Sequence, residues 1–261
     1  MILETLICIS VARQQFTAPK AKTELVAATI GIQPNKPFEI AMHMQMAPGG
    51  WHSYYANPGE SGQATGIVWH LPPGFRAGPI QWPAPTRIVI GGVAAYAYEK
   101  DVWLVTEITP GGSGRPWKTI DISADVNWLL CREACVPQSS KLSLSLPVVA
   151  SAKANPIFAP AIATLPHPLG RVPIKATVAG KQTVIDVGQR SSLDAIRFFP
   201  ADATYFGADP EKVEKTASGM KLVVPLSKYA PGPPKRITGL LVLDSGPMKG
   251  AHWIDLKVTE R

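Results

Sequence analysis

Two cysteines four residues apart are the side chains of this chain best suited to chemistry. Cys131 and Cys135 lie in the segment NWLLCREACVP, and Pro137 follows two residues after the second cysteine. Such a pair can exchange with a disulfide of another protein, form an inert structural bridge or bind a metal. A zinc site needs two further ligands, and no second close pair of Cys or His residues occurs. The sequence therefore favours redox use or a structural bridge over a metal, without deciding between them.

The spacing of the two cysteines restricts the backbone between them if they form a disulfide. The Cβ atoms of a disulfide lie roughly 3.5–4.5 Å apart. Four residues along a straight strand separate Cβ atoms by about 13 Å, and one helical turn by about 5–6 Å. We therefore expect a tight turn or bulge between a strand that ends near Leu130 and a strand that begins at Lys141, with Pro137 at the corner. So short a loop makes a weak staple, which favours redox use.

Three methionines form a second candidate site in the segment MHMQM. Thioether sulfur suits Cu(I), so a copper-binding protein that uses Met42, Met44 and Met46, with or without the thiols, is an alternative function. On a strand, however, these three side chains point to one face. A methionine face of this kind is more typical of a packed core. The five histidines lie far apart and show no zinc spacing; they are His43, His52, His70, His167 and His252.

The elements that must position these residues are predicted to be β-strands. Short apolar runs alternate with turns rich in the 26 prolines and 22 glycines of the chain. In the first half we expect strands over residues 23–32, 38–47, 66–71, 102–108, 119–130 and 141–148. In the second half we expect strands over residues 173–180, 183–188, 195–200, 221–226, 237–244 and 252–258. The segment KLSLSLPV alternates strictly, so that Leu142, Leu144 and Leu146 share one face of a half-buried strand.

The chain is long enough for two domains. Its 261 residues exceed the usual size of one small domain. An Ala- and Pro-rich segment over residues 151–170 indicates a linker, with room for one short helix. We therefore predict an all-β fold of two β-sandwich domains, over residues 20–150 and 171–261. Residues 1–19 are predicted to be a leader or a disordered N-terminus.

Composition argues against two kinds of partner. The formal net charge is +7 and the pI about 9.3, but the basic residues are interspersed with acidic ones, so we expect no nucleic-acid site. No apolar segment reaches the roughly 20 residues of a membrane-spanning helix. The apolar start MILETLICISVAR has neither a basic beginning nor a small-residue cleavage site, so an export signal is not evident. Cys8 has no assigned role.

Several motifs together resemble the amino-terminal periplasmic domain of the DsbD thiol reductases, and more closely that of the related ScsB proteins, which are linked to copper tolerance. The resemblance is carried by NWLLCREACVP, PGGWHSYYANPGESG, GPIQWPAPTRIVIGG and YAYEKDVWLVTEI. It covers residues 20–150. The second half, especially ITGLLVLD, is similar to the additional β-domain of ScsB-like proteins.

This resemblance implies an immunoglobulin-like fold for the sandwich and a thiol:disulfide oxidoreductase activity without a cofactor. Cys131 and Cys135 would cycle between dithiol and disulfide, with Cys135 forming mixed disulfides and Cys131 resolving them. A thioredoxin-like protein or domain would donate electrons, and an oxidised periplasmic thiol protein would accept them. The family continues into a membrane domain where this sequence ends, so the sequence is expected to be either part of a longer protein or a free-standing relative, which would depend on a separate membrane electron carrier. The expected location is the periplasm.

The resemblance also predicts residues around the cysteine pair. A cap that covers the pair until a partner docks matches Arg87, Ile88, Val89, Ile90 and Gly91. This cap is aliphatic where the studied reductases carry an aromatic residue. The aromatic residues Trp51, Tyr54 and Tyr55 match a stretch that flanks the active site, with core packing as the alternative. A structural interaction module with an inert disulfide is the third alternative function.

Overall fold

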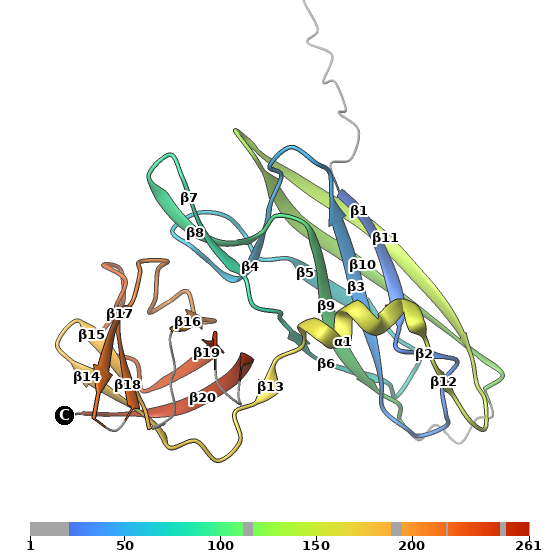
Figure 1. The fold of residues 1–261 in the computed structure, drawn as a ribbon. Helices are drawn as coiled ribbons and strands as arrows, with labels where there is room; N and C mark the ends of the chain where they lie inside the picture. The colour runs from blue at the N-terminus through green and yellow to red at the C-terminus, as the bar shows by residue number, and fades with distance from the viewer. Residues whose placement is uncertain (1–20, 112–116, 189–194, 218, 246–248, 261) are drawn as a thin grey trace, which may run out of the picture.

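The computed structural model of the chain describes residues 21–111, 117–188, 195–217, 219–245 and 249–260. Within these ranges the fold is all-β, as predicted, apart from one short helical segment between the two halves (Figure 1). The predicted leader over residues 1–19, including Cys8, lies outside the described residues. Nowhere in the described ranges does a helix have the length and hydropathy that crossing a membrane requires.

The first half contains two facing sheets. One sheet has the strand order β1 (Ala21–Ala27), β3 (Phe38–Met46), β9 (Asp101–Thr109) and β6 (Arg76–Gln81). The other has the order β11 (Cys135–Pro147), β10 (Thr119–Cys131) and β5 (Gly66–His70). Alternate residues of β3 and β10 are buried in one shared core, as the two-residue repeat of strands requires. This is the immunoglobulin-like sandwich that the resemblance implied.

A smaller sheet extends from one end of this sandwich. It has the order β4 (Ser53–Gly59), β8 (Val93–Tyr98) and β7 (Thr86–Ile90). Strands β7 and β8 form a hairpin that turns at Gly91 and Gly92, whose φ angles are 58° and 82°. Both angles lie in the left-handed region that glycine adopts without steric cost. In Figure 1 this hairpin projects as an arm beside β4.

Short elements connect the two halves. The two-residue strands β2 (Thr29–Ile30) and β12 (Lys153–Ala154) pair with each other. A 3-10 turn (Pro156–Phe158) and the helix α1 (Ala159–Thr164) follow, within the segment predicted to be a linker with a short helix. Phe158 and Ala161 are fully buried against the outer face of the first sheet, on Val26, Ala41, Trp103 and Val105. The connection is therefore packed onto the first sandwich.

The second half is one continuous sheet folded into two layers. Its strand order is β16 (Ile196–Pro200), β19 (Arg236–Leu243), β20 (Gly250–Glu260), β14 (Ile174–Ala179), β15 (Gln182–Val187), β18 (Gly219–Pro225) and β17 (Lys212–Thr216), with β13 (His167–Pro168) beside β20. Strand β20 pairs with β19 over most of its length and with β14 through its last residues. It therefore joins the two layers, whose inner faces form a second core.

The two halves touch at the small sheet. The ring of Tyr96 on β8 meets Phe199 on β16 edge to face, with centroids 5.3 Å apart. The buried Asn57 on β4 donates a hydrogen bond from Nδ2 to the carbonyl oxygen of Phe206, at 3.0 Å. Arg87 on β7 donates from Nε to the carbonyl oxygen of Ala208, at 2.6 Å. In Figure 1 the β16 side of the second half accordingly lies next to the arm formed by β4, β7 and β8.

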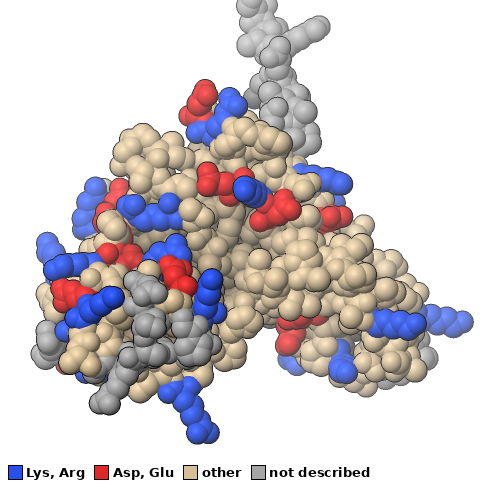
Figure 2. Space-filling model, viewed as in Figure 1, with Lys and Arg blue, Asp and Glu red and all other residues tan. Residues whose placement is uncertain are grey.

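Charged side chains of both signs are mixed over the visible surface. Figure 2 shows Lys and Arg interspersed with Asp and Glu on this face, with wide uncharged areas between them. This distribution matches the interspersed charges of the sequence.

Candidate redox site

The two cysteines close a long β-hairpin. Strands β10 and β11 pair residue by residue from Thr119↔Pro147 to Cys131↔Cys135, and a disulfide joins the last pair, with Cα atoms 4.0 Å apart. Residues 132–134 form the turn, in which the Arg132 amide donates to the Ala134 carbonyl at 3.2 Å. The tight turn expected between the cysteines is therefore present.

The predicted start of the second strand at Lys141 was wrong. Strand β11 begins at Cys135, so Pro137 lies within the strand, opposite Leu129, and not at a corner. The reason is that β11 is an edge strand, with β10 on one side only. At an edge, the proline nitrogen, which has no hydrogen to donate, can face solvent. The strand can therefore continue its pairing with β10 past the proline.

The two sulfur atoms differ in accessibility. Cys131 is 2% exposed, whereas Cys135 is exposed. Cys131 is also held on its other side, because its amide and carbonyl exchange two hydrogen bonds with the backbone of His52, at 2.9 and 3.0 Å. One cysteine is thus fixed inside the fold, and the other lies at the free edge of the sheet.

The β7–β8 hairpin lies over the buried side of the disulfide. Tyr54, Ala95 and Cys131 form a small apolar cluster, against which Ile88 and Leu129 pack. Of the five predicted cap residues, Ile88 therefore contacts this cluster. Val89 and Ile90 are 57% and 43% exposed, at the end of the hairpin next to Gly91. Arg87 turns away and binds the second half through Ala208.

The three predicted aromatic residues lie in three different places. Tyr54 is buried, with its hydroxyl oxygen 3.9 Å from the Cys135 sulfur. Trp51 is half-buried, and the guanidinium of Arg132 lies 5.3 Å from its ring centroid. Tyr55 is fully buried in the main core, where its ring meets Trp82 and Tyr96 edge to face. Adjacent strand residues point to opposite faces, so Tyr54 faces the disulfide and Tyr55 does not.

His52 is a residue of the site that the sequence analysis missed. It is 2% exposed, its backbone pairs with Cys131, and its Nε2 lies 3.2 Å from the Tyr54 hydroxyl oxygen. The two rings meet edge to face at 5.3 Å. Burial lowers the pKa of His52, because it disfavours the charged imidazolium, and raises the pKa of Tyr54 by the same effect on the phenolate. A histidine two residues before a tyrosine on a strand shares its face, and this spacing was the available signal.

The methionines lie in the core. Met42 and Met44 are 0% exposed and Met46 is 6% exposed, all within the main apolar cluster of the first half. Their burial on one face of β3 is accounted for by packing. Among the residues that the structure describes, no group of three His, Cys, Asp or Glu side chains could hold a metal ion.

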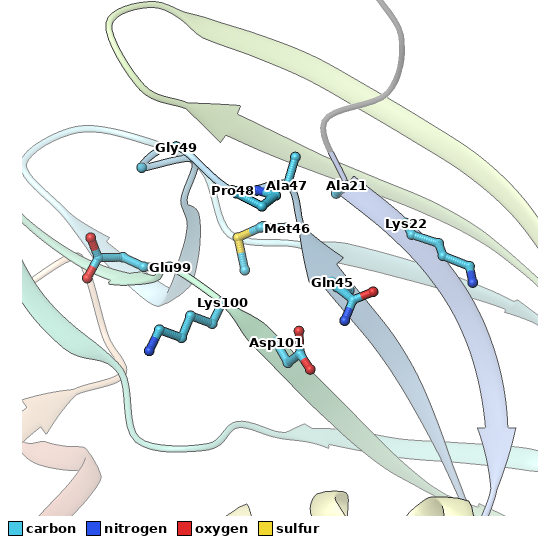
Figure 3. A pocket seen from close by; sticks show the side chains of 11 residues that line it. Ala21, Lys22, Gln45, Met46, Ala47, Pro48, Gly49, Glu99, Lys100 and Asp101 are labelled. Carbon is cyan, nitrogen blue, oxygen red and sulfur yellow. The ribbon is translucent and has the colours of Figure 1, made fainter.

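An open groove lies beside the redox site. Its volume is about 1220 Å³, and it is bounded by the loop over residues 46–50, the turn over residues 99–101 and the start of β1. Figure 3 shows Met46 near its centre, with Lys22, Glu99, Lys100 and Asp101 around it. The loop that lines it leads directly into Trp51 and His52. The cysteines do not line it, so the groove is a neighbour of the site.

Comparison with known proteins agrees with this geometry. The family described as "Thiol:disulfide interchange protein DsbD, N-terminal" matches residues 14–147. No curated protein matches the sequence. The crystal structure of the N-terminal periplasmic domain of ScsB from Proteus mirabilis matches with a TM-score of 0.68 and 17% identity, over 94% of this chain and 95% of that chain. This match shows a common fold that includes both halves.

Two matches to chaperone structures are much weaker. The YadV chaperone covers 90% of this chain and 99% of its own at 10% identity, with a TM-score of 0.25. The periplasmic chaperone SfaE covers 92% and 100% at 10% identity, with a TM-score of 0.24. These scores support no argument. The family match spans just over half of the chain and contains the whole hairpin with its disulfide, and the chain therefore belongs to the family of DsbD amino-terminal domains.

Proposed function

We propose that this protein is a periplasmic module that passes reducing equivalents through Cys131 and Cys135 to oxidised protein partners. The observation that carries the proposal is the asymmetry of the disulfide. Cys135 is exposed at the end of an edge strand, and Cys131 is buried under Ile88. A structural bridge has no need of such asymmetry, whereas an exchange reaction needs one accessible sulfur and one protected sulfur.

The exchange proceeds in two steps that each make and break one S–S bond. In the reduced protein the Cys135 thiolate attacks a sulfur of the partner disulfide, which forms a mixed disulfide and releases one partner thiolate. The Cys131 thiolate then attacks Cys135 Sγ, re-forms the internal disulfide and releases the second partner thiolate. Two electrons pass to the partner, and two protons follow from the module's thiols. The hairpin pairing holds the Cys131 and Cys135 backbones together for the second step.

The β7–β8 hairpin acts in this proposal as the cap over the cysteines. Ile88 shields the buried side of the disulfide, while the exposed Val89 and Ile90 offer an apolar contact to an arriving partner. Movement of the hairpin about its strand ends would open the site. No atom lies near a Cβ built at Gly91 or Gly92, so the tip is free of close contacts.

The partners follow from the family and remain part of the proposal. A thioredoxin-like protein or domain would reduce the Cys131–Cys135 disulfide, and an oxidised periplasmic thiol protein would receive the electrons. A separate membrane electron carrier would supply the donor. The periplasmic location is supported by the matched ScsB structure, which is described as a periplasmic domain.

The reduction potential of the disulfide tests the proposal. The reduced fraction would be measured by thiol alkylation across a series of dithiol redox buffers. A potential between about −180 and −270 mV lies in the range of exchange proteins and supports the proposal. A potential below about −300 mV is typical of a structural bridge and contradicts it. The measurement needs no knowledge of the natural partner.

A further inference from the structure

A short polar chain runs from the exposed sulfur into the protein. The Tyr54 hydroxyl oxygen lies 3.9 Å from Cys135 Sγ and 3.2 Å from His52 Nε2. Tyr54 is 3% and His52 is 2% exposed, so both lie inside the fold behind the cysteine. The three groups come from two elements: His52 and Tyr54 from β4 and the residue before it, and Cys135 from the start of β11.

The surroundings of His52 indicate whether its Nε2 accepts or donates the hydrogen bond with Tyr54. Nε2 lies 3.2 Å from the Tyr54 hydroxyl oxygen, and the backbone of Gly50 raises the pKa of the ring against the larger effect of burial. A backbone group that favours the protonated ring does so as an acceptor, so we assign the proton of the neutral ring to Nδ1, on the side away from Tyr54. In the neutral ring Nε2 is then an acceptor, and the Tyr54 O–H donates to it. The Tyr54 oxygen is left free to accept from Cys135.

We propose that His52 is a positioning residue that takes up the proton of the Cys135 thiol through the hydroxyl of Tyr54. The inference rests on the proposed exchange function and extends it to the origin of the attacking thiolate. Before the shift, the Cys135 S–H donates to Tyr54 Oη, and the Tyr54 O–H donates to His52 Nε2. The shift moves two protons and changes no oxidation state.

The proton shift conserves protons and charge. The thiol proton passes to the Tyr54 oxygen, and the former hydroxyl proton of Tyr54 passes to His52 Nε2. The result is a Cys135 thiolate, a neutral Tyr54 and a His52 imidazolium. The thiolate now accepts a hydrogen bond from Tyr54, and the imidazolium donates one to the same oxygen. After attack on the partner disulfide, the proton returns through Tyr54 to the released partner thiolate.

Burial determines when the Cys135 thiolate and the His52 imidazolium are stable together. Burial disfavours an isolated imidazolium at His52 and a phenolate at Tyr54. The imidazolium is therefore stable chiefly when the thiolate faces it across Tyr54, since opposite charges attract strongly in a medium of low dielectric constant. The neighbouring β7, β8 and β10 contribute the apolar Ile88, Ala95 and Leu129 to this region.

Few other charged side chains lie near the relay of Cys135, Tyr54 and His52. Glu99, on the turn after β8, raises the pKa of His52, against the larger effect of burial. On the β10–β11 turn, Arg132 and Glu133 form an exposed ion pair with each other, at 3.5 Å. Arg87 on β7 is bound to the second half.

The test measures the ionisation of Cys135 alone. In a background with Cys8→Ser and Cys131→Ser, Cys135 is the only cysteine, and its rate of alkylation by iodoacetamide would be followed against pH, because only the thiolate reacts. Tyr54→Phe removes the hydroxyl that links the two groups. His52→Gln keeps an acceptor for Tyr54 but takes up no proton. Each variant is expected to move the midpoint of the pH profile upward by about one unit, so that the rate at pH 7 falls about tenfold. The double variant is expected to fall no further than either single one.

Tyr55→Phe is the matched control. It makes the same chemical change one residue along the strand, where the side chain faces the core, and its profile is expected to stay that of the background protein with Cys8→Ser and Cys131→Ser. Thermal unfolding of each variant shows whether it is folded; if His52→Gln does not fold, Tyr54→Phe decides alone. An unshifted midpoint in a folded variant, or a rate lowered equally at every pH, overturns the relay. Because alkylation needs no disulfide and no partner, this result is independent of the reduction potential that tests the proposed function.

Discussion

The difference between the two cysteines begins with hydrogen bonding and burial at single residues. Cys131 has strand partners on both sides, Cys135 itself and the backbone of His52, whereas Cys135 ends an edge strand. The pairing therefore removes Cys131 from solvent and leaves Cys135 open. A partner disulfide can therefore reach Cys135 at the edge of the sheet, while Cys131 stays covered by the β7–β8 hairpin.

Single cysteine variants should show this difference directly. In a Cys8→Ser background, the Cys135 thiol of the Cys131→Ser protein is expected to react with dithionitrobenzoate at least about tenfold faster than Cys131 does in the Cys135→Ser protein, because a thiolate must be accessible to react. Both rates would be measured under native conditions by stopped flow. Under denaturing conditions the two rates should become equal. Equal native rates would contradict the assignment of Cys135 as the attacking residue.

His52 should make the stability of the oxidised protein depend on pH. Its pKa in the folded state is below the ordinary value of 6.5, so near and below that pH the unfolded chain binds more protons than the folded chain. The free energy of unfolding is therefore expected to fall as the pH drops from about 7 through 6.5 towards the folded pKa, by at most about 1.4 kcal/mol per pH unit.

Urea unfolding at several pH values measures this effect. His52→Gln should flatten the pH dependence over the same window. The paired carboxylates Asp125, Glu214 and Asp255 have lowered pKa values, so their contributions are lost only at more acidic pH. If the wild-type and His52→Gln proteins give the same slope, His52 is not held neutral by burial.

At the scale of elements, the proposed cap is the β7–β8 hairpin, whose outer strand lies at the edge of its sheet. Strand β7 is paired only with β8, and its contact with the disulfide cluster is made by Ile88. Gly91 and Gly92 provide the turn, and the neighbouring Val89 and Ile90 are largely exposed. Ile88 is therefore the half-buried side chain of β7 that links the hairpin to the disulfide cluster.

Truncation of that side chain should expose the disulfide. Ile88→Ala is expected to raise the rate of reduction by dithiothreitol several-fold, with a loss of stability of about 1–2 kcal/mol, below the usual cost at a fully buried site because Ile88 is only half-buried. Val89→Ala, one residue along and exposed, is the control and should leave the rate unchanged. Equal rates for Ile88→Ala and wild type would mean that the hairpin does not limit access to the disulfide.

The sequence predicted most strands that alternate or form apolar runs, but it missed β4, the start of β11 and the hairpin β7–β8. The alternating KLSLSLPV lies in β11 as expected, with Leu146 buried and the serines outward. The first six residues of β11, CVPQSS, are polar and contain a proline, so no strand was predicted there. Strand β4 contains Asn57, Pro58 and Gly59, which usually end strands, and its pairing with β8 is irregular. No strand was predicted over β7 or β8, although Gly91–Gly92 between two apolar runs is a hairpin signal.

In the site too, features set by local sequence were predicted, and features set by tertiary contacts were not. Spacing alone indicated a tight turn between the cysteines, and the family resemblance indicated the residues of the cap and the aromatic flank. Which of the adjacent Tyr54 and Tyr55 faces the disulfide depends on the strand's register against β8. The role of His52 depends on its bridge to Cys131, across almost 80 residues of chain. Neither can be read from the order of residues by itself.

At the scale of the whole molecule, the second half supports the sheet that carries the cap. Phe199, Leu240 and Val242 belong to the main core of the first half, although they lie on β16 and β19. Asn57 and Arg87 bind carbonyl groups of the second half from β4 and β7. The base of the cap hairpin is therefore packed between the two halves, while its tip is free.

This shared packing predicts that the two halves unfold together. Phe199→Ala should cost about 3–5 kcal/mol, the usual cost for a buried phenylalanine, because it removes the contact with Tyr96 as well as core volume. Unfolding would be followed in two proteins that each keep one tryptophan, either Trp128 in the first core or Trp253 on β20. Phe199→Ala should lower the midpoint of unfolding by the same amount in both. Phe198→Ala, the neighbouring residue, which points into the second core, is the matched comparison.

Two outcomes distinguish a cap hairpin that is supported by the second half from two halves that unfold independently. If the halves are coupled, both variants give one coincident transition, and Phe199→Ala also raises the rate of disulfide reduction, since the base of β8 loses its support. If the Trp253 signal falls before the Trp128 signal and the reduction rate stays at the wild-type value, the second half does not brace the cap. Phe198→Ala is expected to destabilise the protein without the extra gain in reduction rate, because its ring packs on Phe206 and not on the sheet that carries the cap. The comparison of the two phenylalanines therefore isolates the contact between the halves from stability in general.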